Sequence, residues 1–274
     1  MPEGPEIKRA ADKLAAVIQN ESALLVEFAF PHLQQQAGML TGQTIHKVES
    51  RGKAMLIHFA NVQTIYSHNQ LYGKWAILEQ DERPHPSLQV RIAIHTKQKV
   101  AVLYSASEIE VLPTTGIYKH PYIAKLGVEL LAEAITQMDV LTQISQPRFA
   151  RKNLAAILLD QTFLAGIGNY LRSEILFFAR IHPEARMAEL TPAQRLALAK
   201  AAINITRQSY RTAGITNSLV VANRLKAAGQ SFEQYRHWVF DREGGDCYRC
   251  QSQIVRANVS GRGLYWCSHC QSRG

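Results

Sequence analysis

Apolar residues recur at helical spacing near the start of the chain. Residues three and four positions apart lie on one face of an α-helix. The spacing predicts a helix that runs from Pro5, buries one face and anchors the chain terminus. The apolar positions that carry this prediction are Ile7, Ala10, Ala11, Leu14, Val17 and Ile18.

Short apolar runs follow, and they fit extended chain better than helix. Val90, Ile92 and Ile94, for example, alternate with other side chains in the period of two that a β-strand requires. Seven or eight short strands indicate a sandwich or a barrel. Strands are predicted at residues 24–30, 44–50, 54–59, 63–67, 74–78, 89–96 and 99–104.

The pattern changes after Leu112. The strand signal fades through prolines and glycine at 113–121, and the chain becomes rich in alanine and leucine with helical periodicity. Thr191, Pro192 and Gln194 supply an N-cap, a first-turn proline and a capping amide for one helix. Helices are predicted at about 137–144, 151–160, 168–179 and 191–210. We place the domains at residues 1–125, 126–240 and 241–274.

Length and charge refine this picture. The chain has 274 residues, 46% of them hydrophobic, and a formal net charge of +9. Residues 1–144 carry 13 Lys/Arg and 14 Asp/Glu, whereas residues 145–229 carry 12 and 4. A concentrated positive segment favours a polyanion partner, most simply nucleic acid, although a basic and merely solvated surface stays possible. No apolar stretch is long enough to span a membrane and no secretion signal is present, so we expect a soluble, cytoplasmic protein.

All four cysteines fall in one pattern near the C-terminus: Cys247, Cys250, Cys267 and Cys270. Two Cys-x-x-Cys pairs at this separation are typical of a structural zinc site, in which four thiolates leave no open position for catalysis. Two disulfides are the alternative, which is disfavoured inside a cell. The residues between the pairs suggest a β-hairpin with Arg262 at its tip, next to Ser260.

Several loops carry candidate binding residues. Gly52 indicates a turn that would present Lys53 at a hairpin tip. Residues 68–73 contain Gln70, Leu71 and Tyr72; either the two apolar side chains fold back onto the sheet, or they are exposed for a reason. Farther on, the glycines at 166 and 168 precede Asn169 at a predicted helix start, where backbone N–H groups could bind phosphate, although simple helix-turn chemistry also fits.

The first residues offer candidate chemistry. If Met1 is removed, Pro2 becomes a terminal secondary amine beside Glu3. An α-amino group has a pKa near 7.8, against about 10.4 for lysine, so far more of it is the free base at neutral pH. The free amine is the form that attacks carbon. Many chains begin Met-Pro without chemical consequence, and this stretch alone leaves both interpretations open.

Taken together, these motifs resemble the formamidopyrimidine-DNA glycosylase and endonuclease VIII family of base-excision repair enzymes. The resemblance covers the whole chain and is carried by residues 2–6, 51–53 and 164–170 and by the four-cysteine finger with Arg262. Residues 3–7 and 69–73 are more similar to the bacterial endonuclease VIII branch. That branch implies oxidised pyrimidines as substrates rather than 8-oxoguanine.

The resemblance implies an α+β multidomain fold: an N-terminal β-sandwich with an N-terminal helix, a helix-two-turn-helix domain and a four-cysteine zinc-finger β-hairpin. A bacterial, nucleoid-associated monomer would bind damaged double-stranded DNA and hold one structural Zn²⁺. Pro2 would form a Schiff base with the sugar, and β- and δ-elimination would leave a one-nucleotide gap.

The resemblance also implies roles for single residues. Glu3 would transfer a proton, and Lys53 and Arg262 would contact phosphate and assist elimination. The side chains of Gln70, Leu71 and Tyr72 would fill the space that the damaged base vacates, and Asn169 would bind phosphate. Lys125 stands where relatives have a DNA-contacting arginine, and lysine lacks bidentate geometry.

Two rival functions remain open at this point. A zinc-ribbon DNA-binding regulator would explain the charge segregation and the finger, but not Pro2 and Glu3. An enzyme of the same family with 8-oxoguanine as its substrate would differ only in the lesion it removes.

Overall fold

The computed structural model describes residues 2–259 and 261–272. The chain forms two compact units. Unit 1 comprises Met1–Pro2 and Glu6–Lys125, and unit 2 comprises Glu3–Pro5 and Leu126–Gly274. Three residues near the N-terminus are therefore part of the second unit, although the chain on both sides of them belongs to the first.

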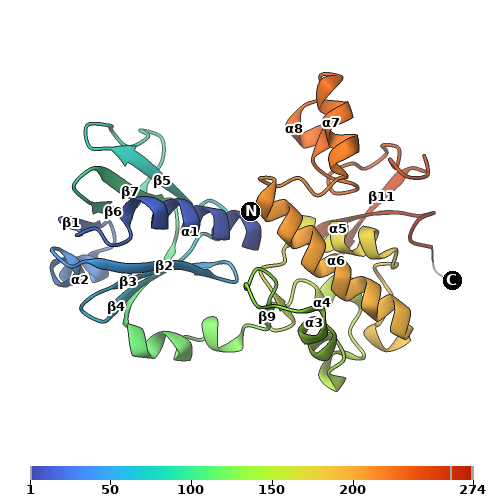
Figure 1. Cartoon of the computed structure of the whole chain (residues 1–274), viewed down its shortest axis with the longest axis horizontal. Helices are drawn as coiled ribbons and strands as arrows, with labels where there is room; N and C mark the ends of the chain where they lie inside the picture. The colour runs from blue at the N-terminus through green and yellow to red at the C-terminus, as the bar shows by residue number, and fades with distance from the viewer. Residues whose placement is uncertain (1, 260, 273–274) are drawn as a thin grey trace. The chain divides into compact units, whose positions relative to one another are not determined.

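Unit 1 contains two four-stranded antiparallel sheets, with strand orders β1-β6-β7-β5 and β2-β3-β4-β8. In Figure 1 the two sheets lie one above the other with α1, in dark blue, between them. The elements are α1 (Gly4–Ile18), β1 (Leu25–Phe28), α2 (Gln34–Leu40), β2 (Ile45–Arg51), β3 (Ala54–Phe59), β4 (Gln63–His68), β5 (Lys74–Glu79), β6 (Val90–His95), β7 (Lys99–Tyr104) and β8 (Glu108–Pro113), with 3₁₀ turns at Pro31–Leu33, Thr114–Lys119 and Ile123–Lys125.

One core joins the two sheets and the N-terminal helix. Ile92 and Leu103 from the first sheet pack in the same cluster as Ile57 from the second, and Leu14 of α1 completes it. Burial of the inner faces of two sheets against each other defines a β-sandwich. The predicted sandwich with its N-terminal helix is confirmed, and α1 begins one residue before the predicted Pro5.

Two elements of unit 1 carry weak sequence signals. In β8 the residues Glu108 and Glu110 alternate with Ile109, but the strand is short and ends at Pro113, so its pattern merges with the following turns. Helix α2 has three successive glutamines in its first turn and buries only Leu40. A single buried residue gives no periodicity to detect.

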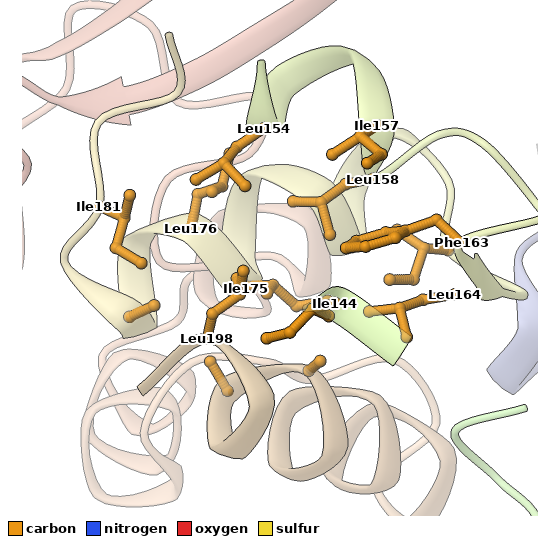
Figure 2. Close-up of a cluster of buried hydrophobic side chains, with 14 of the residues drawn as sticks. Ile144, Leu154, Ile157, Leu158, Phe163, Leu164, Ile175, Leu176, Ile181 and Leu198 are labelled. Carbon is orange, nitrogen blue, oxygen red and sulfur yellow. The ribbon is translucent and has the colours of Figure 1, made fainter. Parts of the chain in front are cut away.

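Unit 2 is mainly helical. Its elements are β9 (Val128–Glu129), α3 (Gln137–Ile144), α4 (Leu154–Ile157), β10 (Leu164–Ala165), α5 (Asn169–Ala179), α6 (Pro192–Arg211), α7 (Leu219–Ala227), α8 (Phe232–Tyr235), β11 (Ile254–Val259) and β12 (Arg262–Cys267), with 3₁₀ turns at Pro147–Phe149 and Met187–Glu189. Figure 2 shows its core, in which Ile175 and Leu176 of α5 gather with Leu198 of α6 and Ile144 of α3. The predicted helices at 137–144, 168–179 and 191–210 are confirmed to within one residue.

The helix predicted at 151–160 is much shorter than expected. It starts at Leu154 and ends at Ile157, and the side chain of the preceding Asn153 caps it by accepting a hydrogen bond from Ala156 N at 2.8 Å. The Asp160 side chain then accepts hydrogen bonds from the backbone N–H and the hydroxyl of Thr162, which fixes a turn. Side chains that bond to the local backbone in this way compete with helix.

The C-terminal hairpin pairs β11 with β12 in antiparallel register, from Ile254 with Cys267 to Val259 with Arg262. The predicted four-cysteine hairpin is thus present. Ser260, expected at its tip, lies outside the described residues. Within the described part of the chain, no helix has the length and apolar character needed to cross a bilayer.

Candidate active site and DNA-binding residues

Glu3 is seated at the N-terminus of α5. Its Oε2 accepts hydrogen bonds from the backbone N–H groups of Gly168 at 2.7 Å and Leu171 at 3.3 Å, and its Oε1 accepts one from Tyr170 at 2.8 Å. The residue is only 2% exposed. The first N–H groups of a helix lack partners within the helix and carry partial positive charge, so this position stabilises a carboxylate.

These three hydrogen bonds, which we call the Glu3 seat, correct one expectation from the sequence. Phosphate binding by the N–H groups of the turn before Asn169 was one of two interpretations of the sequence, but three of the N–H groups at this helix end bind Glu3 instead. The anion at the start of α5 is therefore part of the chain itself. The sequence correctly indicates a helix N-terminus that binds an anion. It does not reveal that the anion is Glu3, because a partner 165 residues away in sequence gives no local signal.

Two glycines make the seat possible. A Cβ on Gly168 would lie 2.4 Å from Cδ of Glu3, so any larger residue would displace the carboxyl group. A Cβ on Gly4 would lie 3.0 Å from Cα of Gly166, and Gly4 N donates to the Gly166 carbonyl at 2.8 Å. The N-terminal segment is thus held to the 166–168 turn by backbone and side chain together.

Pro2 directly precedes this anchored segment and is half-buried. It is one peptide bond away from Glu3, whose carboxyl group cannot move without breaking three hydrogen bonds. Met1 lies outside the described residues. The arrangement keeps the position of Pro2 defined at a chain end, where backbone is usually frayed.

Lys53 lies in the two-residue turn between β2 and β3, where Gly52 has φ of +58°. The predicted hairpin turn is confirmed, but the prediction that Lys53 is exposed there is wrong, because this residue is only 8% exposed. Its backbone N–H donates to the phenol oxygen of Tyr122 at 2.9 Å, so the segment after β8 packs on the turn. Burial lowers the pKa of His68, and the positive charge of Lys53 acts in the same direction while Glu108 opposes it.

The loop between β4 and β5 is a compact turn closed by a hydrogen bond from Gly73 N to the Asn69 carbonyl at 2.7 Å. Gln70 has φ of +50°. Leu71 is 50% exposed and Tyr72 75% exposed, so neither folds back onto the sheet, and that alternative is wrong. Two adjacent large apolar side chains in water are typical of a binding surface.

Lys125 lies at the end of the last 3₁₀ turn of unit 1 and is exposed. The helix-start residue Asn169 is in unit 2, where its Nδ2 donates to the Gly263 carbonyl at 2.8 Å and its Oδ1 accepts from Arg172 at 2.5 Å. The Asn169 side chain therefore connects α5 to the C-terminal hairpin. One of its amide hydrogens is used in that connection.

Arg172 is a functional-site candidate that sequence reasoning missed. It is fully buried, and it donates to the carbonyls of Ala155 at 2.9 Å and Gly263 at 3.4 Å as well as to Asn169. Burial lowers its pKa to about 10; the positive charge of Arg262 acts in the same direction, and Glu3 opposes it. An arginine within the apolar run of a core helix was the available signal.

Arg262 is the first residue of β12 and is exposed. It is thus in a strand, paired with Val259, rather than free in the tip loop as the sequence suggested. Its neighbour Gly263 is held by Asn169 and Arg172 through its carbonyl. The backbone next to Arg262 is therefore attached to the helix whose N-terminus binds Glu3.

The four cysteines form the one group of three or more His, Cys, Asp or Glu residues in the described chain with metal-binding geometry. All four Sγ atoms lie within 4.8 Å of one another, and none is in a disulfide. Four Zn–S bonds of about 2.3 Å in a tetrahedron require S–S separations of about 3.8 Å. Cys247 and Cys270 are 4.0 Å apart, and Cys250 and Cys267 3.4 Å. The cluster can bind a metal ion with a closed shell.

A second buried carboxylate in unit 2 was also missed. Glu174 of α5 is fully buried and accepts hydrogen bonds from Thr216 Oγ1 and from the backbone N–H groups of Trp238, Val239 and Phe240. Burial raises its pKa, and these four bonds oppose the shift. The contacts fix the segment that leads into the finger.

The comparisons with known proteins agree along the whole chain. Residues 1–105 match the family model described as formamidopyrimidine-DNA glycosylase N-terminal domain, and residues 126–220 match the formamidopyrimidine-DNA glycosylase H2TH domain. The chain is 42% identical to Endonuclease 8 of Pectobacterium atrosepticum and to that of Salmonella arizonae, covering 99% of this chain and 100% of each relative. The chain belongs to the formamidopyrimidine-DNA glycosylase and endonuclease 8 family.

Members of this family are DNA glycosylases and AP lyases of base-excision repair, and the chain is an enzyme of this class. The resemblance found in the sequence is confirmed. In solved structures the fold is similar to that of Lactococcus lactis Fpg in complexes with DNA that contains N7-benzyl-Fapy-dG or an abasic site. Both have a TM-score of 0.82, with 23% and 22% identity and coverage of 99% of this chain and 100% of the other.

Proposed function

We propose that this family member excises oxidised pyrimidines from damaged double-stranded DNA and then cleaves the strand by β- and δ-elimination. The observation that carries the proposal is the Glu3 seat. It keeps a buried carboxylate one residue from Pro2 and binds the N-terminal segment to α5. A terminal secondary amine held beside a carboxylate is suited to covalent attack on a sugar carbon.

In the first step, the lone pair of the Pro2 nitrogen forms a bond to C1′ of the damaged nucleotide. The bond from C1′ to the base breaks, and its electron pair and a proton leave with the base. Opening of the sugar ring places a proton on the ring oxygen and leaves an iminium between C1′ and Pro2. Glu3 is the proposed proton carrier, and its negative charge stabilises the cation that forms.

The iminium then acidifies the sugar hydrogens beside it. Loss of a C2′ proton expels the 3′ phosphate (β-elimination), and a further proton loss expels the 5′ phosphate (δ-elimination). Water releases Pro2 from the sugar fragment, which leaves a one-nucleotide gap. Lys53 and Arg262 are proposed to bind the departing phosphates and assist the two eliminations, because a cation stabilises the charge on a leaving phosphate.

The remaining candidates are proposed to contact DNA. Leu71 and Tyr72, which are exposed on their loop, would enter the stack with Gln70 when the damaged base leaves it. Lys125 is exposed and is proposed to bind backbone phosphate, as is Asn169 through its second amide hydrogen. The complexes of Lactococcus lactis Fpg with lesion-containing DNA support DNA as the partner.

We further propose that the metal is Zn²⁺, that its role is structural and that the enzyme acts as a monomer. The four thiols satisfy a tetrahedral ion completely, so none of its positions would remain for water or substrate. We also propose the domain limits 1–125, 126–240 and 241–274, with the second part as the helix-two-turn-helix domain.

The test is borohydride trapping on duplex DNA that contains thymine glycol, followed by mass analysis of the labelled peptide. We expect the label on Pro2 in protein from which Met1 has been removed. A control chain with Gly-Ser added before Pro2 keeps the sequence of the fold but has no free Pro2 amine, and it should not be trapped. A label on a lysine would overturn the proposed nucleophile.

Substrate preference requires a separate measurement. We expect faster excision of dihydrouracil than of 8-oxoguanine opposite cytosine, compared as single-turnover rates in the same duplex. Equal or reversed rates would overturn the predicted preference for oxidised pyrimidines and leave the Pro2 chemistry intact.

A further inference from the structure

The loop that carries Leu71 and Tyr72 is held from outside by Ser107 of the β7–β8 connection and by Glu108, the first residue of β8. Ser107 Oγ donates to Oε1 of Gln70 at 2.6 Å, and Nε2 of Gln70 donates to Oε2 of Glu108 at 3.0 Å. Both ends of one amide are thus bonded, to residues 37 and 38 positions away. Two bonds from opposite ends of an amide fix its orientation as well as its position.

Glu108 is itself attached to the core of the sandwich. Its Oε1 accepts a hydrogen bond from the hydroxyl of Tyr66 at 2.9 Å, and Tyr66 is fully buried in β4. The Tyr66 ring packs against His120 with ring centres 4.1 Å apart. Glu108 also lies opposite His68 in the β4–β8 register, with 3.5 Å between Oε2 and Nδ1 of that residue. One carboxylate therefore connects a rigid interior to a surface loop.

The backbone conformation of the loop is also restricted. Gln70 has a positive φ, and a Cβ on Gly73 would lie 2.5 Å from the Asn69 carbonyl oxygen. Leu71 and Tyr72 make up the exposed part of this turn. An apolar side chain that must enter a base stack gains affinity if the loop is ordered before binding, because less conformational entropy is then lost.

We infer that Ser107 and Glu108 are positioning residues that hold Gln70 and so present Leu71 and Tyr72 for insertion into damaged duplex DNA. The inference rests on the proposed function of that loop. Ser107 and Glu108 act through Gln70 and do not touch the reacting atoms. We call Ser107, Gln70 and Glu108 the clamp. The clamp requires an acceptor oxygen at position 108 for the Gln70 amide, rather than a negative charge.

The first experiment measures insertion without chemistry. Duplex DNA carries a tetrahydrofuran abasic analogue with 2-aminopurine opposite it, and the fluorescence change at saturating protein is recorded. We expect Glu108→Ala to lose at least half of the wild-type change. Glu108→Gln keeps an acceptor oxygen and should retain most of it, and Ser107→Ala should fall between. The matched control is Glu110→Ala, which removes the next carboxylate on the same face of β8. Glu110 is hydrogen-bonded to His120 and not to the loop.

The second experiment separates positioning from catalysis. Borohydride trapping rates are compared on duplex and single-stranded oligonucleotides with an abasic site, since a single strand has no opposing stack to fill. We expect Glu108→Ala to lower kcat/KM about tenfold on the duplex and at most about twofold on the single strand. Melting curves identify any variant that fails to fold. If Glu108→Ala does not fold, the result is decided by Glu108→Gln. A folded Glu108→Gln protein that loses as much duplex activity as is expected of Glu108→Ala overturns the clamp.

The two proposals fail in different ways. Wild-type protein that is never trapped on Pro2 refutes the proposed chemistry, while the fluorescence arm still tests the clamp. Normal trapping by wild type, together with an unchanged fluorescence signal and unchanged duplex rate in Glu108→Ala, overturns the clamp alone.

Discussion

The two units position their candidate residues by different means. In unit 2 the backbone positions Glu3, which is held by the N–H groups of Gly168, Tyr170 and Leu171 at the start of α5. In unit 1 side chains hold the candidate residues: Gln70 is fixed by Ser107 and Glu108, and the turn that contains Lys53 is fixed by the phenol of Tyr122.

This difference predicts how each unit responds to mutation. A backbone seat tolerates changes in surrounding side chains but fails when a new atom enters the space, so its response should be all or none. A side-chain network loses one bond at a time, each worth about 0.5–1.5 kcal/mol, and can be partly rescued by a conservative replacement.

Metal removal should have the largest effect and be confined to unit 2. Structural zinc contributes roughly 10–16 kcal/mol to the folding of a small finger. Chelation should therefore abolish hydrogen-exchange protection in β11 and β12 and lower DNA affinity at least tenfold, while β3 in unit 1 keeps its protection. A metal-free protein with a protected hairpin would show that the hydrogen bonds from Asn169 and Arg172 to the Gly263 carbonyl are sufficient without the ion.

Gly168→Ala should have the next largest effect. The new Cβ would lie 2.4–2.5 Å from the Glu3 carboxyl group, which must leave its seat. We expect the trapping rate to fall at least 100-fold, equivalent to about 2.7 kcal/mol, with a smaller loss of about 1–2 kcal/mol in folding stability.

Gly116→Ala is the control for this substitution, because a Cβ there meets no atom within 4 Å. It should leave the trapping rate and the unfolding free energy close to wild type. A Gly168→Ala protein that traps DNA at the normal rate would mean that the seat of Glu3 is not needed for catalysis.

The smallest effect concerns a side-chain network on the second sheet of unit 1. The hydrogen bond from His58 is the main cause that holds the pKa of Glu49 at about 2, below its usual 4.5; burial opposes it and Lys47 assists. A lowered pKa stabilises the fold above pH 4.5, and that stabilisation is lost as the pH falls from about 4.5 to about 2. Glu49 is partly exposed, so we expect about 1 kcal/mol.

Urea unfolding of wild type and Glu49→Gln measures this contribution, with exchange of the β3 amides as the readout for unit 1. The difference in unfolding free energy should be about 1 kcal/mol at pH 7 and shrink between pH 5 and pH 3. In a His58→Gln background the same substitution should have almost no effect. A difference that does not change with pH would exclude the Glu49–His58 pair as its source.

The sequence predicts elements with a strong local pattern. Helix α1 has six apolar positions on one face, and the cysteine spacing indicates the finger hairpin without any knowledge of the fold. Elements with few buried residues, such as α2 and α8, have no such pattern; α8 buries none of its four residues.

The residues of the candidate site could be predicted from the sequence, but the contacts that they make could not. Pro2, Glu3, Lys53 and Arg262 could be proposed from motifs, yet the partners of these residues lie far away in sequence. The backbone N–H of Lys53 donates to Tyr122, 69 residues later, and the side chain of Arg172 donates to the carbonyl of Gly263, 91 residues later. Tertiary packing of this kind leaves no trace in local periodicity.

The seat of Glu3 also has a consequence in time. Glu3 leaves the ribosome early, and the N–H groups that bind it belong to residues made 165 to 168 positions later. At about 5–20 residues per second, roughly 8–34 s separate the synthesis of the two partners. The N-terminal amine is thus made first and held last, so a nascent or truncated chain that lacks α5 has the nucleophile but not the carboxylate seat beside it.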